Sequence, residues 1–339
     1  YYQLISYFNS ISESGRAVKF ANSEPFITAP TKEQFEILFE KDGRIADARA
    51  TLESNQSDIK LAQKQRELVD SGHATERNFL RQGLVRYYSF DGNDSGVSVL
   101  QGQPWLSSGI SGTAASLDGD SQFKVESDPM FVTEYRWSIS FWMKPSTVGD
   151  SVIISRQEIS TTRPGITVEL KDGHLQFYIM TRWIAGVAAV ETLEELVPGE
   201  WRHVTVTNDG SYSPRGMKIF LDGKAVPTRE LHNTNSNKDV FAKNAKFRVG
   251  GGVVGKNYKG LIDELRIYDR TLWEDEVALL AVPEQVKEIA ATKPKHRSSE
   301  GSAKLQAYFL DNDASEEQRS LASSLFEARI ERLNFHDSL

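Results

Sequence analysis

The chain has 339 residues, a formal net charge of −7 at pH 7 and no cysteine. This length suits two domains, or one large domain with extensions. The negative charge argues against a nucleic acid or an anionic membrane as a partner bound through bulk charge. Without cysteine there are no disulfides, thiolate metal sites or cysteine nucleophiles, and no haem attached through cysteine in this segment. The longest apolar runs, about seven residues, are far shorter than the ~20 of a membrane span.

Residues 1–82 begin irregularly and continue as a predicted long helix. Thr31 and Gln34 have the spacing of a capping box, which marks a helix start. Apolar residues then recur every seven positions and form one narrow stripe: Leu38, Ile45, Leu52 and Ile59. Gly43 lies inside this pattern, where a glycine favours a kink. A narrow stripe suits pairing with a second helix, so we expect a helical hairpin or stalk.

Residues 83–270 consist of short segments in which apolar and polar residues alternate. β-Branched and aromatic residues dominate them, as in residues 137–143 and 217–221. A period of two predicts strands with one buried face. Asp172-Gly173 and Asp222-Gly223 stand between or after such segments, where a tight hairpin needs a positive φ. The spacing of the segments predicts a mainly β fold, an antiparallel β-sandwich.

Residues 271–339 return to helical patterns. Thr271 with Glu274 and Ser315 with Gln318 have the spacing of capping boxes. Both flanks of the sandwich are amphipathic, so each needs a partner. The simplest architecture pairs the C-terminal helices with the N-terminal helix. The predicted domains are therefore 1–82, 83–270 and 271–339.

The middle zone resembles the laminin G-like, concanavalin A-like jelly-roll family. The resemblance rests on five stretches in the order and spacing of that family: 84–92, 138–144, 201–207, 220–224 and 260–268. It implies a jelly-roll sandwich. It does not imply one ligand, because this fold binds sugars, proteins and calcium, and sometimes only fills space.

The two helical flanks resemble a second, more narrowly distributed family. Residues 1–15 and 305–333 look like parts of two conserved domains in large exported multi-domain proteins with a planctomycete-type cytochrome C module. The chain begins at Tyr1 rather than at Met, and we interpret it as a piece of a longer protein. The resemblance implies an extracytoplasmic location, with the flanking domains of the same chain as partners. The haem motif expected elsewhere in such proteins is absent here.

No pattern for catalysis is present. Sandwich glycosidases of this broad architecture place two Glu, with an Asp between them, on one strand face, and no such run occurs here. A nucleophile elbow and a phosphate-binding loop are also missing. We interpret Glu169 and Glu191 as solvated surface acids and His203 as a packed, structural histidine. The chain is therefore predicted not to be an enzyme.

Calcium is the metal that the acidic residues favour, because carboxylate oxygens are its usual ligands. Asp91 and Asp94 cluster in a turn after the first strand, and Asp263 lies on the last strand. In the resembled fold these strands are neighbours and many members hold a calcium there. The resemblance thus implies Asp94 and Asp263 as ligands of a structural calcium, with Asp91 weaker. The alternative is that the first two residues serve the turn and Asp263 caps backbone amides.

Aromatic and polar residues near strand ends form the predicted ligand site. Sugar sites place aromatic faces against the sugar ring and polar groups against its hydroxyls. The candidates are Tyr178, Arg182, Trp183 and Tyr212. Trp183 could instead lie under a loop at the edge of the core. Trp105 is expected to pack at a strand junction.

Three functions follow. The first is a non-catalytic binding module for a carbohydrate or a protein, within a larger exported multi-domain protein. The second is a structural spacer without a ligand. The third is an enzyme with an unrecognised site, which the missing acid pair disfavours. A binding module predicts an exposed aromatic and polar cluster on one face or rim of the sandwich, whereas a spacer predicts that this face is filled or covered.

Overall fold

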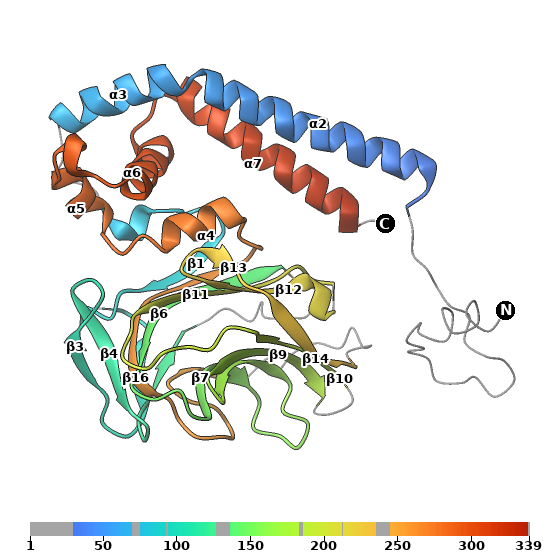
Figure 1. Ribbon diagram of the computed structural model, residues 1–339, viewed down its shortest axis with the longest axis vertical. Helices are drawn as coiled ribbons and strands as arrows, with labels where there is room; N and C mark the ends of the chain where they lie inside the picture. Colours follow the sequence, from blue (N-terminus) through green and yellow to red (C-terminus); the bar gives the residue numbers. More distant parts are fainter. Residues whose placement is uncertain are drawn as a thin grey trace, which may run out of the picture. The chain divides into compact units, whose positions relative to one another are not determined.

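The computed structural model of the chain describes residues 30–69, 75–92, 94–126, 136–182, 186–211, 213–234 and 245–337. The chain divides into two compact units. One comprises residues 1–71 and 306–339 and is helical in its described part, and the other comprises residues 72–305 and contains the β-strands (Figure 1). Among the described residues, no helix is both long and apolar enough to cross a membrane.

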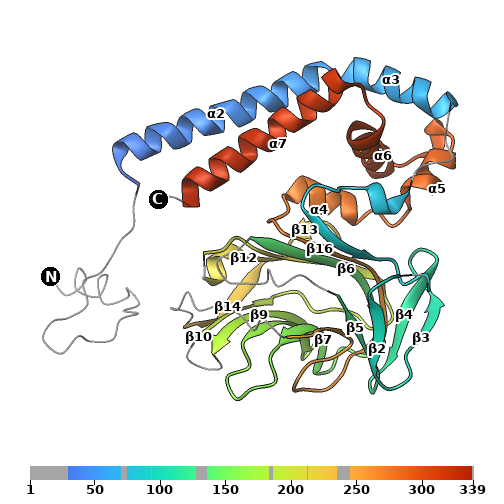
Figure 2. The ribbon, with the colours of Figure 1, turned by 180° about the vertical axis from the view of Figure 1, so that it is seen from behind.

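The helical unit contains α2 (Lys32–Ser54), α3 (Gln56–Val69), α7 (Glu316–Asp337) and the end of α6 (Ser299–Asn312). Two of the three predicted capping boxes are present in this unit. The amide of Gln34 donates to the Thr31 hydroxyl at 3.2 Å, and the amide of Gln318 donates to the Ser315 hydroxyl at 3.3 Å. α7 lies beside α2 (Figures 1 and 2), and the two helices are joined by an ion pair between Arg44 and Glu331.

The predicted apolar stripe forms the buried side of this unit. Ile59 packs against Phe309 and Leu310 of α6. α2 continues without interruption through Gly43, and the break between α2 and α3 lies instead at Asn55. The side-chain amide of Asn55 donates to a carbonyl of the preceding turn at 2.8 Å, which gives that carbonyl a partner where the helix ends.

Two antiparallel sheets form a sandwich, as the alternating pattern predicts. The strands of the first sheet, called the helix-side sheet, are β1 (Leu84–Tyr88), β3 (Trp105–Ser108), β4 (Thr113–Asp118), β6 (Trp137–Pro145), β11 (Arg202–Asn208), β12 (Met217–Leu221), β13 (Lys224–Ala225) and β16 (Lys259–Tyr268). Their order is β13-β12-β11-β6-β16-β4-β3, with β1 also paired to β16. β12 follows a short 3₁₀ turn, η2 (Pro214–Gly216).

The strands of the second sheet, called the groove-side sheet, are β2 (Val97–Gln101), β5 (Gln122–Val125), β7 (Ser151–Gln157), β8 (Gly165–Lys171), β9 (His174–Arg182), β10 (Gly186–Thr192), β14 (Thr228–Asn233) and β15 (Phe247–Val249). Their order is β14-β10-β9-β8-β7-β15-β5-β2. The predicted Asp-Gly turn joins β8 to β9, with φ of 47° at Asp172 and 87° at Gly173.

The core lies between the two sheets and follows from the alternation. Every second residue of β8 and β9 points into it: Ile166, Val168, Leu170, Leu175, Phe177 and Ile179. Trp137 of the helix-side sheet meets Phe177 edge to face, with ring centroids 5.6 Å apart. Because side chains alternate along a strand, Glu169 and Tyr178 point away from this core.

Helical segments accompany the sandwich in the same unit: η1 (Glu76–Asn78), α4 (Glu274–Leu280), α5 (Val286–Ala291) and η3 (Pro294–His296). α4 lies on the outer face of the helix-side sheet and contacts β13 (Figures 1 and 2). Its apolar residues Val277 and Leu280 are buried. The compact unit therefore extends to residue 305, whereas the sequence pattern placed the end of the sandwich domain at 270.

The start of α4 also differs from the prediction. The amide of Trp273 donates to the Glu276 carboxylate at 3.0 Å, so the N-cap residue is Trp273, two residues after Thr271. The hydroxyl of Thr271 donates instead to the carbonyl of Asn208 in β11, at 2.8 Å. A contact with the sheet thus replaces the expected cap.

Candidate functional site

A groove of about 480 Å³ lies over the outward side of β8 and β9. It is lined by Asp150, Ser151, Val152, Glu169, Leu170, Lys171, Gln176, Tyr178, Leu231, His232, Gly255 and Lys256. The pairing of the strands explains the central residues. Glu169 of β8 lies opposite Gln176 of β9, and Tyr178 follows two residues later on the same face.

The groove adjoins a second hollow of about 650 Å³. The two share Asp150, Ser151, Gly255 and Lys256. The second hollow is lined mainly by loop residues and by amide side chains, among them Gln101, Gln122 and Asn257.

Several polar groups of the groove bond to one another. The Tyr178 hydroxyl donates to Gln176 Oε1 at 2.7 Å, and Gln176 Nε2 donates to the Glu191 carboxylate. Glu191 is buried in β10 and also pairs with Arg229 of β14. This row of side chains crosses three strands, and each member has a partner within the protein.

Glu169 differs from its neighbours. In the part of the chain that the structure describes, no hydrogen bond or ion pair reaches its carboxylate, and the side chain is half-buried. Burial raises the pKa of Glu169 to about 7, with Lys171 acting in the opposite direction and Asp150 adding to the rise. Lys171 itself is paired with Asp150 at the rim. The sequence-based interpretation of Glu169 as a solvated surface acid is therefore wrong.

The groove also offers an aromatic and apolar surface. The rings of Tyr178 and His232 lie 6.2 Å apart, tilted by 41°. Tyr178 and Leu231 pack against a small apolar cluster of Met180, Val187 and Ala189, which points away from the main core. An aromatic ring beside a few polar groups is the usual composition of a small-molecule site.

The structure places one of the four predicted ligand residues in the groove, Tyr178. Arg182 lies four residues further along β9, roughly 13 Å away at the rise of a strand. It is exposed and does not line the groove. Trp183 and Tyr212 lie outside the described residues.

Sequence analysis did not assign Glu169, Gln176 or His232, which line the groove beside Tyr178, to a ligand site. The alternation of β8 and β9 already contained a signal for the first two, because it placed both on the outward face with Tyr178. The expectation for Trp105 is also wrong, since its side chain is 51% exposed. Among the strands that the structure describes, β3 is the edge strand of the helix-side sheet and pairs with β4 alone.

The predicted calcium ligands Asp91 and Asp94 bind backbone amides. Asp91 Oδ1 accepts the amide of Thr113 at 2.9 Å. Asp94 Oδ2 accepts the amide of Phe90 at 2.6 Å, and Arg77 lies 3.8 Å from the other carboxylate oxygen. This is the turn chemistry named as the alternative.

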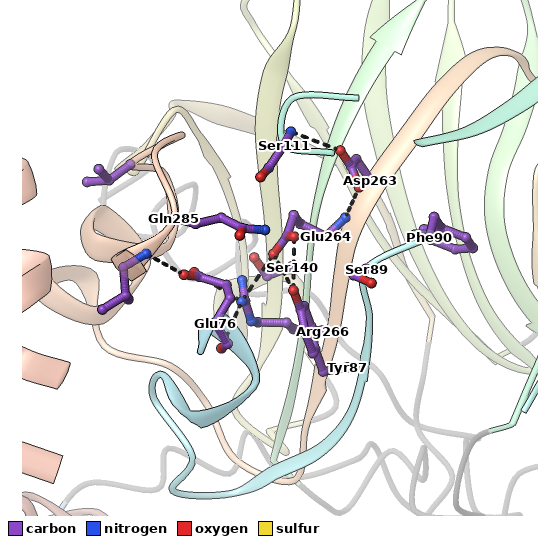
Figure 3. Close-up of polar contacts among 12 residues, drawn as sticks. Glu76, Tyr87, Ser89, Phe90, Ser111, Ser140, Asp263, Glu264, Arg266 and Gln285 are labelled. Carbon is purple, nitrogen blue, oxygen red and sulfur yellow. Dashed lines mark hydrogen bonds and ion pairs between the residues drawn. The ribbon is translucent and has the colours of Figure 1, made fainter. Parts of the chain in front are cut away.

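Asp263 is also engaged by amides. Its Oδ2 accepts the amides of Ile110 and Ser111 at 2.9 and 3.3 Å, and its Oδ1 accepts the amide of Glu264 at 2.9 Å (Figure 3). Among the described residues, no three His, Asp or Glu side chains come together as ligands of one metal ion. Calcium therefore stays a prediction from the sequence.

A bulge in β16 sets up a buried ion cluster on the helix-side sheet. Asp263 and Glu264 both lie between Ile262 and Leu265, which point into the core, and Glu264 has a φ of 52°. The extra residue directs both acidic side chains away from the core. Glu264 then pairs with Arg266, at 3.2 Å.

The same cluster joins both ends of the sandwich unit (Figure 3). Arg266 Nη2 lies 3.2 Å from Glu76 of η1, and Lys304 of α6 lies 2.9 Å from the same carboxylate. Burial opposes the ionisation of Glu76, but Lys304 and Arg266 outweigh it and lower the pKa of Glu76. The Tyr87 hydroxyl donates to Glu264 at 2.9 Å. These residues are packed and paired, and none lines the groove.

His203 is structural, as the sequence indicated. It is buried, its Nε2 lies 2.9 Å from the Ser140 hydroxyl, and its ring lies 5.2 Å from that of Trp142. Burial lowers the pKa of His203 to about 3, and the positive charges of Arg266 and Lys304 add to this effect. A neutral imidazole so far from solvent is a packing group.

Several solved structures are similar to this chain at low sequence identity. Domain 4 of AbnA, a GH43 extracellular arabinanase from Geobacillus stearothermophilus, in complex with arabinotriose, is 24% identical, with 58% of this chain and 98% of that chain covered and a TM-score of 0.46. The binding domain of Paraclostridial Mosquitocidal Protein 1 is 18% identical, with 61% and 52% covered and a TM-score of 0.45.

The binding domain of botulinum neurotoxin DC, in complex with rat synaptotagmin II, is 16% identical, with 59% and 51% covered and a TM-score of 0.44. The chain thus spans about half the length of these two toxin domains. No curated protein matches the sequence. Residues 117–278 match the family model of the concanavalin A-like lectin/glucanases superfamily. Over those residues the sandwich is similar to laminin G-type, concanavalin A-like domains.

Proposed function

We propose that this chain is a non-catalytic binding module and that its ligand is a carbohydrate held in the groove. The observation that carries the proposal is that the ring of Tyr178 lines the same groove of about 480 Å³ as the carboxyl of Glu169, which has no hydrogen bond or ion pair among the described residues. A sugar offers both an apolar ring face and hydroxyl donors, which is the chemistry these two groups accept. A protein ligand is the alternative.

The arrangement of the acids supports a non-catalytic role. Glycosidases use two carboxyl groups whose pKa values differ and which both reach the sugar. Glu169 and Glu191 belong to the same row of the sheet, through Gln176 between them. The side chain of Glu191 is only 4% exposed, and it is already bound to Gln176 and Arg229. It is therefore unsuited to act as nucleophile or base.

We further propose that the module works outside the cytoplasm, within a larger exported multi-domain protein. This rests on the resemblance of the flanks to a planctomycete cytochrome C-associated family. The resemblance lies in residues 1–15 and 305–333. The first of these stretches lies outside the described residues. Flanking domains of the same chain would then be its neighbours.

A glycan array with the 339-residue chain tests the proposal, with calcium and with a chelator. Tyr178→Ala should abolish binding, because it removes the aromatic face of the groove. Trp105→Ala is the matched control, since it removes an exposed aromatic ring from an edge strand outside the groove. Loss of binding in the Trp105 variant alone would move the site to that edge. Absence of binding to every glycan would favour a protein ligand or a spacer.

A further inference from the structure

We propose that Glu169 selects the ligand of the groove: its ionised carboxylate accepts hydrogen bonds from hydroxyls of an uncharged sugar, so affinity rises with pH through neutrality. The inference rests on the proposed function of the groove. It adds the class of sugar, the residue that selects it and the response to pH.

Unused hydrogen-bonding capacity points to Glu169. Tyr178, Gln176, Glu191 and Arg229 are linked in one row, so part of their hydrogen-bonding capacity is already used within the protein. In the described chain, Glu169 has no such contact to lose. A half-buried carboxylate without donors is costly, and two hydroxyls of a sugar would supply donors to both of its oxygens.

The surrounding charges favour an uncharged ligand. The titratable and charged side chains around Glu169 come from the rim, the neighbouring strands and one loop. They are Asp150 and Lys171 at the rim, His174, Tyr178 and Glu191 on the neighbouring strands, Arg229 and His232 of β14, and Lys256 of the loop after β15. Lys171 and Arg229 are neutralised by Asp150 and Glu191, and His174 lies 3.7 Å from Glu195. An acidic sugar beside Glu169 would be repelled by the ionised Glu169 carboxylate, whereas an uncharged sugar would not.

Protonation sets the pH response. Burial raises the pKa of Glu169 to about 7, so both forms are populated near neutral pH. Hydrogen bonds to an ionised acceptor are roughly twice as strong as neutral ones, so hydroxyls favour the ionised form. With that pKa the ionised fraction is about 1% at pH 5 and about 90% at pH 8. Exclusive binding to the ionised form would therefore change the affinity about 90-fold.

Calorimetric titration of the full chain tests the inference. The probes are the neutral tetrasaccharides of glucose, xylose, mannose and arabinose, with trigalacturonate as the charged comparison. For a neutral probe that binds, we expect at least tenfold higher affinity at pH 8 than at pH 5. Glu169→Gln should bind more weakly at pH 8 and lose the dependence on pH. Trigalacturonate should bind no better than the neutral probes at pH 8.

Two controls separate Glu169 from other groups. His232→Asn removes the exposed histidine beside Tyr178 and should leave the pH dependence unchanged. Glu200→Gln removes an exposed carboxylate outside the groove and should change nothing. A flat profile in the wild type, or an unchanged profile in Glu169→Gln, would overturn the inference while the groove remained a glycan site. Loss of the pH dependence in His232→Asn would overturn it as well, because the titrating group would then be the histidine.

A spectroscopic readout avoids reliance on affinity alone. In carboxyl ¹³C NMR, saturating neutral probe should lower the titration midpoint of Glu169 by about one pH unit for each tenfold preference for the ionised form. An unchanged midpoint would contradict the inference. If no tetrasaccharide binds to the wild type, while its melting temperature shows a folded chain, the proposed function fails and the inference fails with it.

Discussion

At the scale of single residues, the groove depends on one carboxyl that the sheet partly shields from water and that has no partner in the described part of the chain. Glu169 points outward, as the alternation of β8 requires, yet it is half-buried. Such groups cost stability when they ionise and are more often found at functional sites than elsewhere. The free energy of unfolding should therefore depend on Glu169 and on pH, which can be measured without a known ligand.

Glu169→Gln should stabilise the protein at pH 8. The folded-state pKa of about 7 lies above the ordinary value of 4.5, so the folded chain binds its proton more tightly than the unfolded chain. The stability from this residue is full below pH 4.5 and is lost as pH rises through 7. We expect a gain of about 1–2 kcal/mol at pH 8 and little change at pH 4.5. Urea unfolding at both values measures it, and an equal effect at both would contradict the assignment.

Asp263→Ala should destabilise the sandwich whether or not calcium is present. Its carboxylate holds three backbone amides, those of Ile110, Ser111 and Glu264. Leaving these buried donors unpaired should cost about 2–4 kcal/mol. Thermal unfolding with and without a chelator tests whether the carboxylate stabilises the turn through its hydrogen bonds to the amides or through a bound calcium ion. If the chelator lowers the melting temperature of the wild type but not of the variant, the turn contains a calcium that the predicted ligands bind.

At the scale of secondary-structure elements, the sequence predicted well what depends on near neighbours. The alternation of β8 and β9, the Asp172-Gly173 turn and the cap at Thr31 were all confirmed. What depends on distant neighbours was missed. The environment of Glu169 arises from strands paired across the sheet, and the exposure of Trp105 from the position of β3 at the edge of the described helix-side sheet.

The buried ion cluster of β16, η1 and α6 should act as a unit. Lys304→Met leaves Glu76 with one cation instead of two, and we expect a loss of about 3 kcal/mol. Adding Glu76→Gln should recover part of that loss, because the uncompensated buried charge is then gone. A double-mutant cycle by urea unfolding measures the coupling. Strictly additive losses would show that the two residues act independently.

At the scale of the whole molecule, two units are built from three chain segments. The sandwich unit runs uninterrupted from residue 72 to 305, while the helical unit combines residues from both ends of the chain. Each unit has its own buried cluster, around Phe177 and Trp137 in the sandwich and around Ile59 and Phe309 in the helices. Separate cores are what allow domains to fold alone.

A fragment of residues 72–305 should therefore fold by itself. It keeps both sheets, α4, α5 and Lys304. We expect one cooperative transition in circular dichroism, with a melting temperature within a few degrees of that of the sandwich in the full chain. A fragment ending at residue 298 is the control, because it lacks Lys304 and should melt lower. Failure of the longer fragment to fold would show that the sandwich depends on the helical unit.

The contact of Glu76 with Lys304 has a consequence for the insertion of such a domain into other proteins. These residues stand near the two points where the chain enters and leaves the sandwich, and 2.9 Å separates their side chains. The sandwich unit thus fixes the distance between its own two ends. If it is inserted into a loop of another protein, that protein does not pay the entropic cost of closing a long flexible loop. Entry and exit joined by a buried ion pair would make this segment readily transferable between host proteins.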